Sequence, residues 1–144
     1  MENSESLKLE NQICFPLYAI AKEITGLYRP FLDELDITYP QYLVMMVLWE
    51  NDALTVTNIG DKLFLDSGTL TPLLKRLEAK GFITRKRKKE DERVVQVFLT
   101  ENGRNLKQTA CSVPGKILEK INVQIEDLLE LKESIHKILN KIQK

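Results

Sequence analysis

The sequence predicts a mainly α-helical protein with one small β-hairpin, an α+β fold. Two observations support this fold class: apolar residues recur at helical spacing along most of the 144 residues, and two short β-branched segments flank one charged turn. With 43% hydrophobic residues the chain can bury one core, and its length favours a single domain over residues 1–144.

The first predicted helix belongs to an N-terminal segment, residues 8–36. Its apolar side chains recur at alternating steps of four and three residues, which is the spacing of a helix that packs against another helix. These side chains are Ile13, Leu17, Ile20, Ile24, Leu27 and Phe31.

The second predicted helix is "ITYPQYLVMMVLWEN", residues 37–51. Thr38 and Gln41 have the spacing of a capping box, and Pro40 is tolerated in a first helical turn. Because the rest of the segment is an apolar run, we expect this helix to be fully buried at the centre of the core.

Two shorter helices follow. Thr55 or Thr57 caps "NIGDKLFL", and after a turn at "LDSG" comes "TLTPLLKRLEAKG", residues 69–81, in which Gly81 closes the helix. Two helices joined by a short turn predict a helix-turn-helix.

The hairpin comes next. "FITRKR" and "VVQVFLT" are rich in β-branched and aromatic residues, and they flank the charged turn "KKEDER". A helix-turn-helix followed by a basic hairpin is a winged helix, so residues 38–100 are predicted to be a winged helix-turn-helix.

The last segment, residues 101–144, is predicted to be helical. Thr100 caps "ENGRNLKQTACSV", Pro114 and Gly115 interrupt the chain, and a final helix carries an apolar stripe. Too little core remains to cover this stripe and that of residues 8–36, so we expect both segments to be dimerisation helices that meet across a two-fold axis of a homodimer. The stripe consists of Ile117, Ile121, Ile125, Leu128, Ile135, Ile138 and Ile142.

Composition excludes several classes of protein. No apolar run is long enough to cross a membrane and the start is polar, which predicts a soluble, cytoplasmic protein without a membrane partner. The two cysteines form no disulfide framework, and with a single histidine they cannot make an ordinary zinc site. We therefore expect free thiols, no metal and no cofactor.

The net charge is zero, but the positive charge is concentrated. Residues 1–66 hold four basic and eleven acidic side chains, whereas residues 75–93 hold nine basic and four acidic ones. Basic residues confined to one helix and the hairpin favour DNA binding over a merely solvated face, with the helix in a major groove and the hairpin tip on phosphates or in a minor groove. The predicted DNA-binding residues are Asp66, Ser67, Gly68, Thr69, Thr71, Lys75, Arg76, Arg85, Arg87, Lys88, Lys89 and Arg93.

The segment "LDSGTLTPLLKRLEAKGFITRKRKKEDERVVQVFLTENG" resembles the DNA-binding core of the MarR family of transcriptional regulators, with Asp91 and Arg93 as its structural wing pair. The segment "NQICFPLYAIAKEITGLYRPFLDELDITYPQYLVMMVLWE" resembles the OhrR branch, whose members are thiol-based repressors that respond to organic hydroperoxides. The resemblance covers roughly residues 8 to 140.

Cys14 is the candidate sensor. A lone cysteine on an apolar helix is more often an inert small hydrophobe, but Tyr18 lies one helical turn further on the same face. Tyr28 lies about 21 Å away along a straight helix, so only a partner chain could bring it to the thiol. The resemblance implies that arrangement for Tyr28 and Tyr39, and implies that Tyr18 lies in the same pocket.

The expected chemistry is oxidation of Cys14 by an organic hydroperoxide to a sulfenic acid and then a disulfide, which releases a palindromic operator. Hydroxyl donors stabilise the thiolate and the leaving alkoxide, and Phe15 helps to form an apolar pocket for the organic chain. Cys111 is either a resolving thiol or an inert helix cysteine, and a low-molecular-weight thiol could instead form a mixed disulfide with Cys14. Two alternatives stay open: a repressor controlled by a small aromatic ligand, and a thiol peroxidase. The repressor reading predicts that the chain is not an enzyme.

Overall fold

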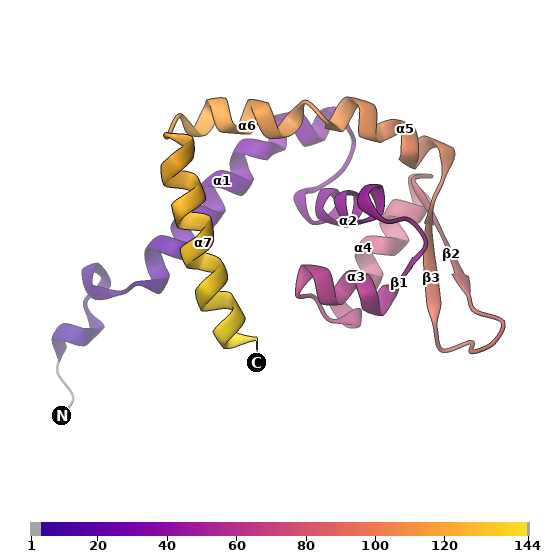
Figure 1. The fold of residues 1–144 in the computed structure, drawn as a ribbon, viewed down its shortest axis with the longest axis horizontal. Helices are drawn as coiled ribbons and strands as arrows, with labels where there is room; N and C mark the ends of the chain where they lie inside the picture. Colours follow the sequence, from indigo (N-terminus) through magenta and orange to yellow (C-terminus); the bar gives the residue numbers. More distant parts are fainter. Residues whose placement is uncertain (1–3, 144) are drawn as a thin grey trace. The chain divides into compact units, whose positions relative to one another are not determined.

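A computed structural model describes residues 4–143 of the chain (Figure 1). Residues 1–3, which begin the polar N-terminal segment, and residue 144, which ends the last predicted segment, lie outside the described residues. The chain divides into two compact units, Met1–Val113 and Pro114–Lys144, and each is described by itself.

The first unit opens with two short 3-10 helices, η1 (Ser4–Leu7) and η2 (Leu9–Asn11), and continues with helix α1 (Cys14–Glu34). The N-terminal segment is thus an α-helix only from Cys14 onward, because the residues before it form 3-10 turns. Pro16 stands in the first turn of α1, where its missing N–H costs no hydrogen bond. Several apolar side chains at the start of α1 are exposed: Ile13, Phe15, Leu17, Tyr18 and Ile20.

Helix α2 (Tyr39–Glu50) lies at the centre of the core, and its cap is the one that the sequence predicts. The backbone N–H of Gln41 donates to the Thr38 hydroxyl at 3.4 Å, and the Thr38 N–H donates to Oε1 of Gln41 at 3.0 Å. The expectation of full burial is wrong at Met46, which is 37% exposed. The buried side chains of α2 are Gln41, Tyr42, Val44, Met45 and Leu48.

Helices α3 (Val56–Leu63) and α4 (Ser67–Ala79) form the helix-turn-helix. Thr55 caps α3 by accepting from the N–H of Asn58 at 3.1 Å, which selects one of the two predicted caps. Helix α3 begins at Val56 and α4 at Ser67, each two residues before the segment that the sequence predicts. Thr55 caps the first helix and Asp66 caps the second. Gly81 ends α4 in the left-handed conformation, with φ of 84°.

Strands β2 (Ile83–Arg87) and β3 (Val95–Leu99) form the predicted antiparallel hairpin, in which Arg85 pairs with Val97. The sequence predicts two strands, whereas the structure has three. Strand β1 (Leu54–Thr55) pairs with β3 and gives the order β1-β3-β2, so the strand that leads into α3 is joined to the hairpin.

Helix α5 (Glu101–Ala110) is capped by Thr100 as predicted, because the Gly103 N–H donates to the Thr100 hydroxyl at 3.0 Å. Trp49 on α2 donates its indole N–H to the carbonyl of Gly103 at 2.8 Å, which holds α5 against the core.

Helix α6 (Val113–Ile121) starts at the last residue of the first unit, and α7 (Ile125–Ile142) completes the second. The predicted interruption before the final helix lies at Cys111 and Ser112, just ahead of Pro114 and Gly115, which belong to the first turn of α6. The final helix has a further break at Asn122, whose φ of 52° is left-handed. On α7 the side chains of Leu129, Ile135, Ile138 and Ile142 are exposed. Among residues 4–143, no helix has the length and apolarity that crossing a membrane requires.

Candidate functional site

The exposed face of α4 carries small polar residues at its start and cations further along. Ser67, Gly68 and Thr69 are exposed and Thr71 is half-buried, while Leu70, Leu74 and Leu77 fill the opposite, buried face. Lys75 and Arg76 are exposed beyond them. This division leaves one side of α4 free to enter a groove.

Asp66 fixes where α4 begins. Its carboxylate accepts from the backbone N–H of Thr69 at 2.7 Å. This bond, together with one from the Thr69 side chain, lowers the pKa of Asp66, so the carboxylate stays ionised at the helix N-terminus. The structure therefore gives Asp66 a capping contact, and it exposes its neighbours Ser67 and Gly68.

The turn of the wing is closed by its own polar contacts. The Arg93 side chain donates to both oxygens of Asp91, at 3.0 and 3.1 Å, which lowers the pKa of Asp91 and raises that of Arg93. Arg87 donates to the carbonyl of Glu92 at 2.7 Å. The structure therefore contains the predicted pair of Asp91 and Arg93 in the wing. Lys89, two residues before Asp91, is exposed.

Arg85 makes a contact that local sequence spacing does not reveal. Its guanidinium donates to Oε1 of Glu78 at 3.0 Å and its backbone N–H donates to Oε2 at 3.0 Å. The side-chain bond is the main reason that the pKa of Glu78 is lowered. This pair fastens β2 to α4, and with 24% exposure the Arg85 side chain is less open to solvent than the wing tip.

Cys14 is the first residue of α1, and its thiol is free and exposed. Tyr18, one turn further on, is 67% exposed. Phe15 and Pro16 line a surface pocket of about 610 Å³ together with Lys8, Leu9 and Glu10. The Cys14 thiol is therefore accessible, and the pocket beside it has both apolar and charged side chains.

Tyr28 on α1 and Tyr39 on α2 lie together, with ring centroids 4.8 Å apart. Tyr42, which sequence reasoning missed, adds a third ring 5.7 Å from Tyr28. Burial, and then the nearby Tyr39 and Tyr42, raise the pKa of Tyr28 to about 12, and burial raises the pKa of the other two as well. All three hydroxyls therefore keep their protons at neutral pH. Tyr39 and Tyr42 are three residues apart on one helix, and this spacing could have predicted that their rings are neighbours.

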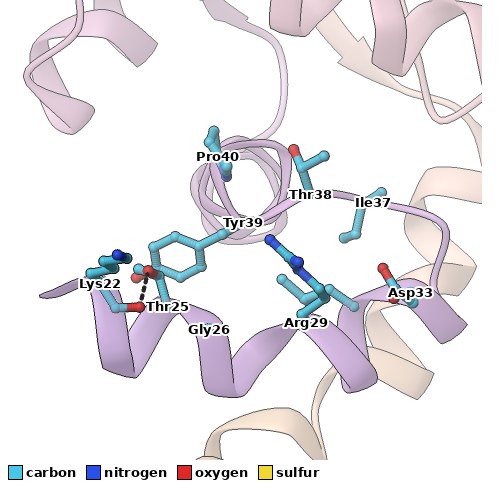
Figure 2. Close-up of a pocket in the computed structure, with 10 residues that line it drawn as sticks. Lys22, Thr25, Gly26, Arg29, Asp33, Ile37, Thr38, Tyr39 and Pro40 are labelled. Atoms are coloured by element: carbon cyan, nitrogen blue, oxygen red, sulfur yellow. Dashed lines mark hydrogen bonds between the residues drawn. The ribbon is translucent and has the colours of Figure 1, made fainter.

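Tyr39 also lines a pocket of about 640 Å³ between α1 and the start of α2 (Figure 2). Its ring projects from α2 toward α1, near Thr25 (Figure 2). Lys22 and Arg29 supply two cations to the lining and Asp33 supplies one carboxylate. Cys14 of the same chain does not line this pocket, because it begins α1 while Tyr28 lies 14 residues later on the same helix.

Cys111 is the C-cap of α5, and its thiol donates to the carbonyl of Gln108 at 2.9 Å. It is free and exposed, like Cys14. Within residues 4–143, no cluster of three or more histidine, cysteine, aspartate or glutamate side chains could hold a metal ion.

The chain is similar to known proteins over most of its length. Residues 26–110 match the family described as transcriptional regulator SarA/Rot. The organic hydroperoxide resistance transcriptional regulator of Bacillus subtilis is 52% identical over 143 residues, which cover 99% of this chain and 97% of that protein.

Two solved structures of AbfR, a protein of Staphylococcus epidermidis, are similar over almost the full chain. Reduced AbfR bound to DNA gives a TM-score of 0.84 at 33% identity, covering 97% of this chain and 98% of that chain. Disulfide-formed AbfR gives a TM-score of 0.68 at 34% identity, covering 98% and 97%.

The residues that match the family model include α2, the helix-turn-helix and the wing, and the similarity to the hydroperoxide resistance regulator extends over 99% of the chain. The chain therefore belongs to the SarA/Rot family of transcriptional regulators and, among the winged-helix proteins of the MarR type, to the branch that contains the organic hydroperoxide resistance regulator of Bacillus subtilis.

Proposed function

We propose that this protein is a homodimeric, DNA-binding repressor that leaves a pseudo-palindromic operator when an organic hydroperoxide oxidises Cys14. One observation carries the proposal: Tyr28 and Tyr39 form a protonated pair beside a pocket, at a distance along α1 that their own Cys14 cannot span. An exposed thiol and a distant set of hydroxyl donors complement each other only if a second chain brings them together.

The exposed apolar stripes support a dimer. On α1, Ile13 is 76% exposed and Ile20 47%, and on α7 Ile138 is 55% exposed and Ile142 71%. Contiguous apolar surface of this kind marks an interface in a protein of this size. A two-fold axis lets the same stripe cover its copy, which places each Cys14 near the partner's tyrosines.

The sensing step is a displacement at oxygen. The Cys14 thiolate attacks the terminal peroxide oxygen, the O–O bond breaks, and the alkoxide leaves and takes up a proton as an alcohol, so that sulfur is oxidised to sulfenic acid. A second thiol, from Cys111 or a small cellular thiol, then attacks the sulfenic sulfur and water leaves, which forms a disulfide. The hydroxyls of Tyr28 and Tyr39 stabilise the thiolate and the developing alkoxide.

In this proposal, α4 and the wing bind the DNA. In a dimer the two α4 helices would enter successive major grooves about one helical turn apart, and Ser67, Thr69 and Thr71 would face base edges or phosphates. Lys75, Arg76 and the wing cations would contact phosphates. AbfR, which has been solved both bound to DNA in its reduced form and with a disulfide formed, supports a redox switch of this kind.

The test uses a duplex that the reduced protein selects from a random library. Organic hydroperoxide should release the wild-type protein from that duplex, with one sulfenic acid or disulfide per Cys14 seen by intact mass. Cys14→Ser should bind the duplex equally well and ignore the peroxide. Cys111→Ser should still be released when a small thiol is present, because its Cys14 can still be oxidised and form a mixed disulfide. Release of Cys14→Ser by peroxide would show that the sensor lies elsewhere.

Two rival functions are tested with the same material. The lining of the pocket at Tyr39 has two cations, Lys22 and Arg29, against one carboxylate, Asp33, so an aromatic anion, salicylate, serves as the probe for ligand control without redox chemistry. Release by salicylate but not by peroxide would favour that rival. Steady-state turnover of peroxide with excess thiol would favour a peroxidase, since a sensor reacts about once in each reduction cycle.

A further inference from the structure

The C-terminal end of α4 is fastened to the corner between α1 and α2 by one side chain, Lys80. Its ammonium donates to the backbone carbonyl of Asp36 and to Oε1 of Gln41, the latter at 3.3 Å. The Asp36 carboxylate lies 3.8 Å from the same ammonium. One cation thus contacts the end of α1 and the start of α2 from the end of α4.

Physical chemistry explains why a cation sits there. Asp36 follows the last turn of α1 with a left-handed φ of 58°, and the carbonyls at a helix C-terminus favour a positive charge. Gln41 is 1% exposed, and the oxygen that Lys80 contacts already accepts from the Thr38 N–H at 3.0 Å. The Lys80 side chain itself is only 27% exposed, so these contacts are partly shielded from water.

The same corner lines the pocket at Tyr39. Ile37, Thr38, Tyr39 and Pro40 line that pocket, and Thr38 and Gln41 are the two halves of the cap that begins α2. Tyr39 thus stands in the same turn as the Gln41 oxygen, and the bond from Lys80 connects that oxygen to the end of α4.

We propose that Lys80 is a positioning residue that couples the state of the Tyr39 pocket to the orientation of α4 on DNA. The proposal rests on the proposed function, because it needs Cys14 oxidation to disturb Tyr39. The ion pair contributes little of the coupling, since the Asp36 carboxylate is 83% exposed. The bonds to the Asp36 carbonyl and to Gln41 carry most of it.

The experiment measures the ratio of operator affinities between the oxidised and the reduced protein. Lys80→Met keeps the aliphatic stem and removes the three contacts, and Lys80→Arg keeps a charged donor. Lys107→Met is the matched control, because Lys107 also lies in the last turn of a helix and its ammonium makes no hydrogen bond or ion pair among residues 4–143. Lys80→Gln replaces Lys80→Met if the latter fails to give the helical circular dichroism of the wild type.

We expect Lys80→Met to bind DNA in its reduced form within about threefold of the wild type, and to lose about two- to thirtyfold of the affinity ratio. Lys80→Arg should restore most of the ratio, which a merely structural loss would not predict, and Lys107→Met should leave it unchanged. If Lys80→Met kept the affinity ratio of the wild type, or bound DNA more weakly by the same factor in both redox forms, the role of Lys80 would be refuted and the proposed function would stand. Absence of any redox response in the wild type would overturn the proposed function with it.

Discussion

The ring of Tyr28 on α1 packs against the ring of Tyr39 on α2, with centroids 4.8 Å apart and planes inclined by 49°. The two residues are eleven positions apart in the sequence, and the corner between the helices brings them together. Burial raises the pKa of each, so their hydroxyls remain donors wherever the protein is folded at neutral pH. A pair of permanent donors beside a pocket suits a thiolate partner.

Removal of the hydroxyls should slow sensing and spare DNA binding. Tyr28→Phe and Tyr39→Phe keep the rings but remove the donors, so the oxidation rate of Cys14 should fall by up to about 100-fold, the effect of losing one preorganised donor. Stopped-flow oxidation with cumene hydroperoxide measures the rate, and filter binding measures the affinity of the reduced form. Tyr42→Phe is the control from the same cluster, and an equal rate loss there would mean that the effect is not specific to the Tyr28 and Tyr39 hydroxyls.

Alkaline pH should destabilise the fold through Tyr28. Its pKa is about 12 in the folded chain against 10.0 as the ordinary value, so the folded state holds the phenol proton more tightly than the unfolded state. This contribution is fully present below pH 10 and is lost as the pH rises through 12. Urea unfolding across this window should show a smaller loss of stability in Tyr28→Phe than in the wild type. Parallel curves would contradict the assignment.

Two cations of the wing should differ in the salt dependence of DNA binding. If a dimer contacts about eight phosphates, the log–log salt slope is about −7, and loss of one contact per chain reduces its magnitude by about two. Lys89→Gln should show this reduction, because Lys89 is exposed at the tip.

Arg85→Gln should instead leave the slope unchanged and lower the stability by about 0.5–1 kcal/mol, because its guanidinium is paired with Glu78. Fluorescence-anisotropy titrations at several salt concentrations give the slopes. A slope change in Arg85→Gln equal to that of Lys89→Gln would mean that Arg85 leaves Glu78 for a phosphate.

Position 103 requires glycine because the carbonyl oxygen of Phe82 lies too close to leave room for a Cβ atom, not because of the backbone angles. A Cβ at this position of α5 would lie 2.1 Å from the carbonyl oxygen of Phe82, so Gly103→Ala should cost about 2 kcal/mol. Gly115→Ala, where nothing lies within 4 Å, should be neutral or slightly stabilising. Thermal unfolding of both variants separates the two cases, and equal midpoints would argue against the observed packing of α5 on the β2 end of the sheet.

Local signals predicted most of the fold. The capping pair Thr38 and Gln41, the cap at Thr100 and the left-handed Gly81 all act within four residues, and the structure has each of them. The third strand was missed because β1 has only two residues, too few for a periodic pattern. The break at Asn122 was missed because Pro114 and Gly115 are stronger breakers by composition, although a first turn accommodates both.

The candidate site was less accessible from the sequence alone. Lys80 contacts Asp36, and Arg85 contacts Glu78, across different helices and strands. Such contacts depend on the tertiary fold and cannot be predicted from the spacing of residues in the sequence. The roles proposed for Cys14, Tyr28 and Tyr39 rest on a resemblance to a family, and on the length of α1 that separates Cys14 from Tyr28. The assembly that brings the three residues together remains the central proposal.

Mixed dimers test that proposal most directly. One chain carries Cys14→Ser with its tyrosines intact, and the other carries Tyr28→Phe and Tyr39→Phe with Cys14 intact, so that the one remaining Cys14 faces the one complete tyrosine pair across the interface. We predict that Cys14 in this mixed dimer is oxidised at the wild-type rate. Oxidation as slow as in the Tyr28→Phe/Tyr39→Phe homodimer would contradict the account.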